Sequence, residues 1–119
     1  MNRRSNAPVF WLLFGAGGML SALLGTAMVY LSGIAAPLGL PPAAGLLDHA
    51  RMLAFAQHGL GKGFLFVTVS LFAWHAVHRI FHSLHDLGVH NGAVAKVACY
   101  GTAAGVTVVA GAALLAVGW

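Results

Sequence analysis

The sequence predicts an all-α membrane protein with three transmembrane helices that pack against further helices of other chains. Three observations support this: 60% of the 119 residues are hydrophobic, only 7% are charged, and the charges flank three long apolar runs. A water-soluble domain carries roughly 25% charged residues, so the few charges here could not cover a soluble surface. The length allows one small domain, and we expect residues 1–119 to form it.

The first span is predicted over residues 9–36. No charged side chain interrupts the sequence between residues 5 and 47, and about 20 helical residues cross the apolar part of a bilayer. Pro37 and the proline pair at 41–42 end this helix, because proline lacks the backbone donor that a helix interior requires. The apolar part of a signal peptide has only about 7–15 residues, so we expect a retained helix.

The second span is predicted over residues 60–78. Its one charged side chain, Lys62, is expected to extend along the helix toward the membrane interface. We expect the helix to begin earlier, with Asp48 as its N-cap, and to continue past Arg79 toward Asp86 outside the apolar region.

The third span is predicted over residues 97–119, which carry no charge. Gly88 and the Asn91-Gly92 pair mark the turn before it. Trp119 is expected in the aromatic belt at the membrane interface.

Three spans place the two termini on opposite sides of the membrane. The positive-inside rule favours a cytoplasmic N-terminus and a periplasmic C-terminus, because this orientation places more basic residues inside than outside. The inside set is Arg3, Arg4, Arg79 and Lys96, and the outside set is Arg51 and Lys62.

Small residues recur four apart on two of the spans. Gly17, Ser21 and Gly25 do so on the first, and Gly101 and Gly105 on the third. Small side chains at this spacing let helix backbones approach closely in lipid. We therefore expect close helix packing, including packing against helices of other chains.

Histidines form a stripe at the end of the second span. His75, His78, His82 and His85 follow one another at steps of three, four and three, which places them on one face of a helix. The stripe has three interpretations: a polar face at the membrane interface, a ligand for haem b, or part of a quinone pocket. Metal handling by a small transporter is a fourth, more distant alternative.

The residues argue against haem held within this chain. Haem b in a membrane usually takes one histidine from each of two helices, and the first and third spans contain none. The lone Cys99 excludes an intramolecular disulfide and a cysteine-ligated iron–sulfur cluster. The chain also has no glycine-rich nucleotide fingerprint, so it is not a complete redox enzyme.

A quinone needs hydrogen-bond donors for two oxygens on an apolar ring, and the chain offers them at one membrane boundary. Trp11 begins the first span and the His78-Arg79 pair ends the second, so all three face the same side. Gln57 and His58 lie roughly 30 Å from Arg79 along a continuous helix and mark the opposite side.

Several segments, in order along the chain, resemble the membrane anchor of bacterial quinol:fumarate reductase that is known as its D subunit. The resemblance covers nearly the whole chain and is most specific between residues 8 and 19. The segments are Pro8-Val9-Phe10-Trp11, Leu13-Phe14-Gly15-Ala16-Gly17-Gly18-Met19, Pro37-Leu38-Gly39-Leu40, Leu53-Ala54-Phe55-Ala56-Gln57, and His78-Arg79 with His82 and His85-Asp86.

The resemblance implies a three-helix protein of the bacterial inner membrane, part of a multi-subunit helical anchor. With a companion membrane anchor, the C subunit, such a protein holds the flavoprotein and iron–sulfur subunits on the cytoplasmic face. The complex oxidises menaquinol and reduces fumarate in anaerobic respiration, with FAD and the iron–sulfur clusters confined to partner subunits. The anchor of this branch lacks haem.

The resemblance also implies residue roles. The positions matching Trp11, His78 and Arg79 bind menaquinol near the iron–sulfur subunit. A second, distal quinone region is associated with the positions matching Phe55 and Gln57, which adjoin His58. A haem-b anchor of a succinate dehydrogenase and a purely structural anchor remain the alternatives.

Overall fold

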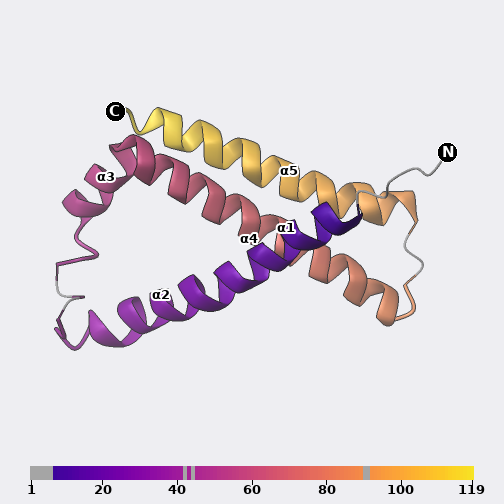
Figure 1. Ribbon diagram of the computed structural model, residues 1–119, viewed down its shortest axis with the longest axis horizontal. Helices are drawn as coiled ribbons and strands as arrows, with labels where there is room; N and C mark the ends of the chain where they lie inside the picture. The colour runs from indigo at the N-terminus through magenta and orange to yellow at the C-terminus, as the bar shows by residue number, and fades with distance from the viewer. Residues whose placement is uncertain (1–6, 42, 44, 90–91) are drawn as a thin grey trace.

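The structure is a computed structural model that describes residues 7–41, 43, 45–89 and 92–119. All the regular elements in these ranges are helical (Figure 1). Three helices are long and apolar enough to cross a membrane: Ala7–Ala35, Gly59–Asp86 and Ala93–Ala116. The predicted three-span fold is therefore confirmed. Arg3, Arg4, Pro42 and Asn91, used in the predictions above, lie outside the described residues.

The first span is one continuous helix built from four labelled parts. These are α1 (Ala7–Leu20), η1 (Ser21–Gly25), α2 (Thr26–Tyr30) and η2 (Leu31–Ala35), where η marks a wider turn of π-helix. The helix ends at a Schellman motif: the amide of Leu40 bonds the carbonyl of Ala35 at 2.9 Å, and that of Gly39 bonds the carbonyl of Ala36 at 3.1 Å. Gly39 has φ +66°, a left-handed conformation that favours glycine.

The second span does not begin near Asp48 as predicted. A separate helix, α3 (His49–Gln57), comes first, and the chain bends at His58 before α4 (Gly59–Asp86) begins. The Nδ1 atom of His58 accepts a hydrogen bond from the amide of Leu60 at 3.3 Å, so His58 caps α4. Gly61 permits the bend, because a Cβ atom there would overlap the carbonyl of Phe55.

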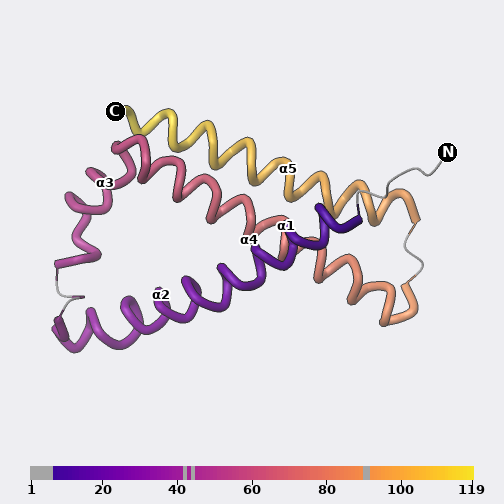
Figure 2. The backbone as a smooth tube through the Cα atoms, viewed as in Figure 1, coloured from indigo at the N-terminus to yellow at the C-terminus, as the bar shows by residue number. Residues whose placement is uncertain are grey.

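α4 is longer than the predicted apolar span and reaches Asp86. The chain turns away just after the helix at Gly88, which has φ +76° and whose amide bonds the carbonyl of His85 at 3.0 Å. The third span, α5 (Ala93–Ala116), packs along α4, and α1 crosses α4 (Figure 2). The α2 part of the first span diverges from α4, as the tube shows.

Almost no large apolar side chain is buried. In the described part of the chain, the buried apolar residues are three alanines, Ala35, Ala43 and Ala103. Small residues such as Gly17 and Ala103 are buried, whereas many large apolar side chains are exposed, as expected for a protein surrounded by lipid and partner helices.

Lys62 is buried against the C-terminal end of α5. It is 7% exposed, and its Nζ atom donates to the carbonyls of Leu114, at 2.9 Å, and Gly118. Its location near the membrane interface stays a prediction. The ring of Trp119 lies 4.6 Å from the same Nζ. The last carbonyls of α5 have no partner within the helix and carry partial negative charge. They therefore accept hydrogen bonds from the ammonium group of Lys62.

Candidate functional site

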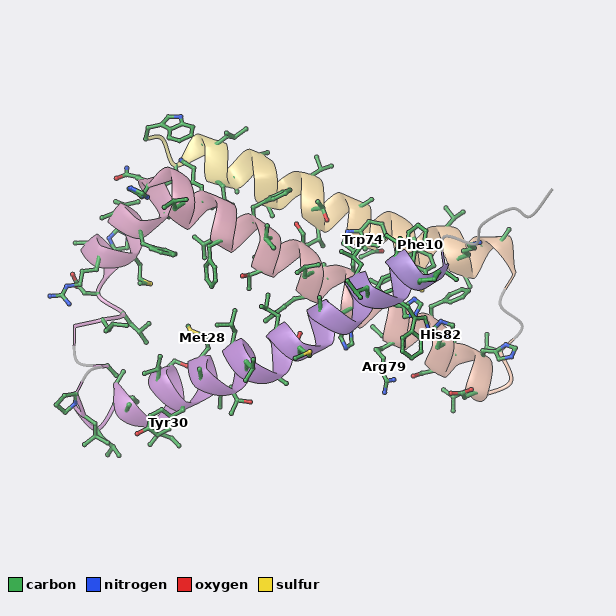
Figure 3. The ribbon with its side chains drawn as sticks, in the orientation of Figure 1. Phe10, Met28, Tyr30, Trp74, Arg79 and His82 are labelled. Carbon is green, nitrogen blue, oxygen red and sulfur yellow. The ribbon has the colours of Figure 1, made fainter. Side chains whose placement is uncertain are left out.

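A cavity of about 340 Å³ lies between α1 and the C-terminal half of α4. Figure 3 shows Arg79 and His82 beside α1. The lining residues are Trp11, Phe14 and Gly15 from the first span and His75, His78, Arg79 and His82 from the second. The three residues that the sequence placed at one boundary, Trp11, His78 and Arg79, therefore line one cavity.

Two glycines bring the two helices together next to this cavity. A Cβ atom at Gly17 would lie 2.8 Å from the carbonyl oxygen of Leu71, and one at Gly18 would lie 2.8 Å from Cε1 of His75. The Nδ1 atom of His75 lies 2.9 Å from the carbonyl oxygen of Phe14, which can only accept, so Nδ1 carries the proton. Close backbone approach and this hydrogen bond fix α1 against α4.

The ring of His78 is held on three sides. It stacks on the ring of Phe14 with centroids 3.9 Å apart and meets the ring of His82 edge-on at 4.3 Å. Its Nδ1 atom lies 3.0 Å from the hydroxyl of Tyr100 on α5. Of the histidine stripe, His75 and His78 are thus half-buried between helices, whereas His82 and His85 are exposed.

Sequence reasoning missed Phe14 and Tyr100 as members of this region. Phe14 stands three residues after Trp11, which places it on the same helix face, so its position carried a signal. Tyr100 carried a weaker one: a hydroxyl-bearing ring near the start of a span that otherwise offers few polar side chains. The part of α4 that Tyr100 contacts depends on how α5 packs against α4.

The cavity is open to the surroundings of this chain. The side chain of Trp11 is 82% exposed, and Arg79 is exposed as well. Among the residues that the structure describes, Arg79 is the one arginine or lysine that lines the cavity. A bound molecule would therefore meet an indole N–H, imidazoles and a guanidinium on this side and needs a second surface to cover it.

The residues predicted for a distal site lie near the other end of α4, and they do not all line the same cavity. Phe55 and His58 line a separate cavity of about 590 Å³ with Leu60, Gly61 and Phe64. Gln57 points elsewhere: its Nε2 atom donates to the carbonyl of Val117 at 3.3 Å. The distal quinone region stays a prediction.

No metal centre is apparent in the residues that the structure describes, where no three potential ligands among His, Cys, Asp and Glu gather at one point.

The fold and cavity define a three-span helical membrane protein with a cavity near one end of α4, lined by an indole, imidazoles and a guanidinium. Over residues 1–115 the chain matches the model of the fumarate reductase D-subunit family, and it belongs to that family. The fumarate reductase D subunit of Shewanella sp. (strain W3-18-1) is 44% identical over 110 residues, which are 91% of this chain and 88% of the relative.

A second relative is similar to this chain to about the same degree. The fumarate reductase D subunit of Vibrio cholerae serotype O1 (strain M66-2) is 45% identical over 101 residues, covering 85% of this chain and 77% of the relative. The resemblance found in the sequence is thereby confirmed at the level of the family.

Proposed function

We propose that this chain is a membrane anchor of a quinol:fumarate reductase. In this proposal it joins the companion C subunit in the bacterial inner membrane and holds the iron–sulfur and flavoprotein subunits on the cytoplasmic face. Family membership supports this, as do the large apolar side chains that α1, α4 and α5 leave exposed. The N-terminus lies in the cytoplasm and the C-terminus in the periplasm, as the distribution of basic residues favours.

We further propose that menaquinol is oxidised at the cavity between α1 and α4. The observation that carries this proposal is that Trp11, His78 and Arg79, from two separate helices, line one space. Its volume of about 340 Å³ lies within the usual range of small-molecule sites, and it combines aromatic walls with a few polar groups. The exposed indole of Trp11 supports closure of the site by a partner protein.

Each residue has a distinct role in this proposal. The Nε1–H group of Trp11 donates a hydrogen bond to one oxygen of the substrate. Arg79 stabilises negative charge on the oxygen that loses a proton, an electrostatic role that is strongest where water is excluded. His78 accepts a proton, since imidazole titrates near neutrality. Electrons leave to an iron–sulfur cluster of the partner, because this chain has no ligands for one.

The test compares Arg79→Leu with Arg51→Leu in the assembled complex. Arg51 is an exposed arginine on α3, at the opposite end of the molecule. We expect Arg79→Leu to lower menaquinol-dependent fumarate reduction by about 100-fold, as for loss of one preorganised charge-stabilising group, while activity with a soluble dye donor persists. Unchanged menaquinol activity in Arg79→Leu would leave a purely structural anchor as the function.

The proposal also assigns no haem to this anchor. The first and third spans contain no histidine, so this chain cannot supply both axial ligands of a haem from two of its helices. An absorption spectrum of the purified complex should show no haem Soret band. A Soret band in amounts matching the complex would favour the haem-b anchor of a succinate dehydrogenase.

A further inference from the structure

Tyr100 is the one hydrogen-bonding partner from α5 that reaches the histidines around the cavity, among the contacts of the described residues. Its hydroxyl lies 3.0 Å from Nδ1 of His78. The ring of Tyr100 is itself fixed by neighbours on α4: its centroid lies 6.1 Å from that of Trp74 and 5.5 Å from that of Phe81. Tyr100 does not line the cavity, so it contacts His78 from behind.

This contact determines which nitrogen of His78 is available to the cavity. The ring is stacked on Phe14 and bounded by His82, so it has little freedom to flip. With Nδ1 bonded to the hydroxyl of Tyr100, Nε2 at the opposite edge of the imidazole is the nitrogen left for a bound molecule. An imidazole that accepts a proton at one nitrogen has to carry a proton on the other.

A tyrosine hydroxyl suits this requirement better than a carbonyl or an amide N–H. A hydroxyl both accepts and donates, whereas a carbonyl only accepts and an N–H only donates. The oxygen of Tyr100 can therefore accept from Nδ1–H when Nε2 is bare, and its O–H can donate to a bare Nδ1 when Nε2 is protonated. His78 keeps its hydrogen bond in both tautomers.

We propose that Tyr100 is a positioning residue that holds His78 with Nε2 free for proton transfer with the quinol and stays hydrogen-bonded to Nδ1 in either tautomer. This inference rests on the proposed function. In the oxidative direction an O–H bond of the substrate breaks, an Nε2–H bond forms on His78, and Nδ1–H donates to Tyr100. The two electrons leave one at a time to the iron–sulfur acceptor of the partner, and the second proton leaves by another route.

The test uses Tyr100→Phe in the assembled complex, with Tyr30→Phe as the matched control. Tyr30 is the other tyrosine of the chain and is exposed at the end of α2. We expect Tyr100→Phe to lower the menaquinol-dependent kcat by about tenfold, with KM changed by less than about twofold and dye-dependent activity unchanged. Rates are expressed per assembled complex, so that a loss of assembly does not imitate the effect.

A second comparison separates an effect through His78 from a general loosening of the helices. In a His78→Gln background, Tyr100→Phe should produce no further decrease in kcat, because the group that it positions is gone. An equal decrease in both backgrounds, or an unchanged kcat in Tyr100→Phe alone, would overturn the role of Tyr100.

The outcome with Arg79→Leu distinguishes the two proposals. If Arg79→Leu lowers the menaquinol-dependent rate and Tyr100→Phe does not, the cavity is the quinol site and the role of Tyr100 is wrong. If neither variant nor His78→Gln lowers that rate, the proposed function itself is wrong.

Discussion

Trp11 borders the cavity and is also exposed toward the surface where a partner subunit would bind in the proposed complex. Its indole is 82% exposed and borders the cavity that His78 and Arg79 also line. A large aromatic side chain with one N–H donor is common where one end of a group is apolar and the other polar. In the proposed site the ring makes apolar contact with the quinol, and the N–H orients the quinol through a hydrogen bond.

Trp11→Phe isolates the contribution of that N–H. The variant keeps an aromatic ring and removes the donor, so the substrate loses one hydrogen bond and little contact area. A net hydrogen bond contributes about 1 kcal/mol, so KM for menaquinol should rise about three- to tenfold. Steady-state kinetics of the assembled complex measure it, with a soluble dye donor as the control. A normal KM together with poor assembly would instead indicate a docking role for Trp11.

At this scale the sequence predicted part of the candidate site. The gathering of Trp11, His78 and Arg79 followed from span boundaries alone, because helix ends on one side of a membrane lie at the same depth. The contact between His78 and Tyr100 could not be predicted, because it depends on the rotation of α5 about its own axis. The apolar surface of α5 is too uniform to fix that rotation from sequence.

The crossing of α1 and α4 is the structural element that places the site. It depends on Gly17, where a Cβ atom would lie 2.8 Å from the carbonyl oxygen of Leu71 and 3.0 Å from Cβ of His75. Both neighbours are backbone or close to it, so they cannot move aside cheaply. The distance between the two helices, and with it the width of the cavity, is set here.

Gly17→Ala should therefore destabilise this crossing. Overpacking a close helix contact costs about 1–3 kcal/mol, and the change should appear as a lower Tm and a lower yield of the assembled complex. Gly25→Ala is the matched control, because a Cβ atom at Gly25 has nothing within 4 Å of it in this chain. Equal stability of the two variants in the complex would contradict the proposed packing of α1 on α4.

Helix boundaries were predicted less well than helix number. The break at His58 was missed although Gly59, Gly61 and Gly63 follow it, because glycine is also common inside membrane helices and because the overlap at Gly61 arises only once α3 packs against α4. The hydrogen bonds of Lys62 could not be predicted for a related reason. Its partners are carbonyls at the C-terminus of α5, the first of them 52 residues further along the chain. The contact therefore depends on how α5 packs against α4.

The whole molecule is an open arrangement that leaves much apolar surface uncovered. Among the described residues the buried apolar side chains are alanines, and a Cβ atom at Gly101 or Gly105 on α5 would have nothing within 4 Å of it. Composition predicted a membrane-embedded chain, and the small residues spaced four apart predicted packing against helices of other chains. Partner helices and lipid are the surfaces that would cover the rest.

Orientation is the property of the whole chain that the proposed function needs most. The α1 end and the Arg79 end of α4 must face the cytoplasm, where the soluble subunits would bind. Alkaline phosphatase, which is active only in the periplasm, should be active when fused after Trp119 and inactive when fused between α4 and α5. The reverse pattern would place the cavity on the wrong side of the membrane for this function.

The central claim is that one quinol is held between α1 and α4, at the end of the molecule where Trp11 and Arg79 lie. Photolabelling of the assembled complex with a photoreactive menaquinone analogue, followed by peptide mapping, tests it most directly. We predict cross-links in the peptides that contain Trp11–Gly15 and His75–His82, and competition by unmodified menaquinol. Competed cross-links confined to the Phe55–Phe64 region, at the other end of α4, would contradict the claim.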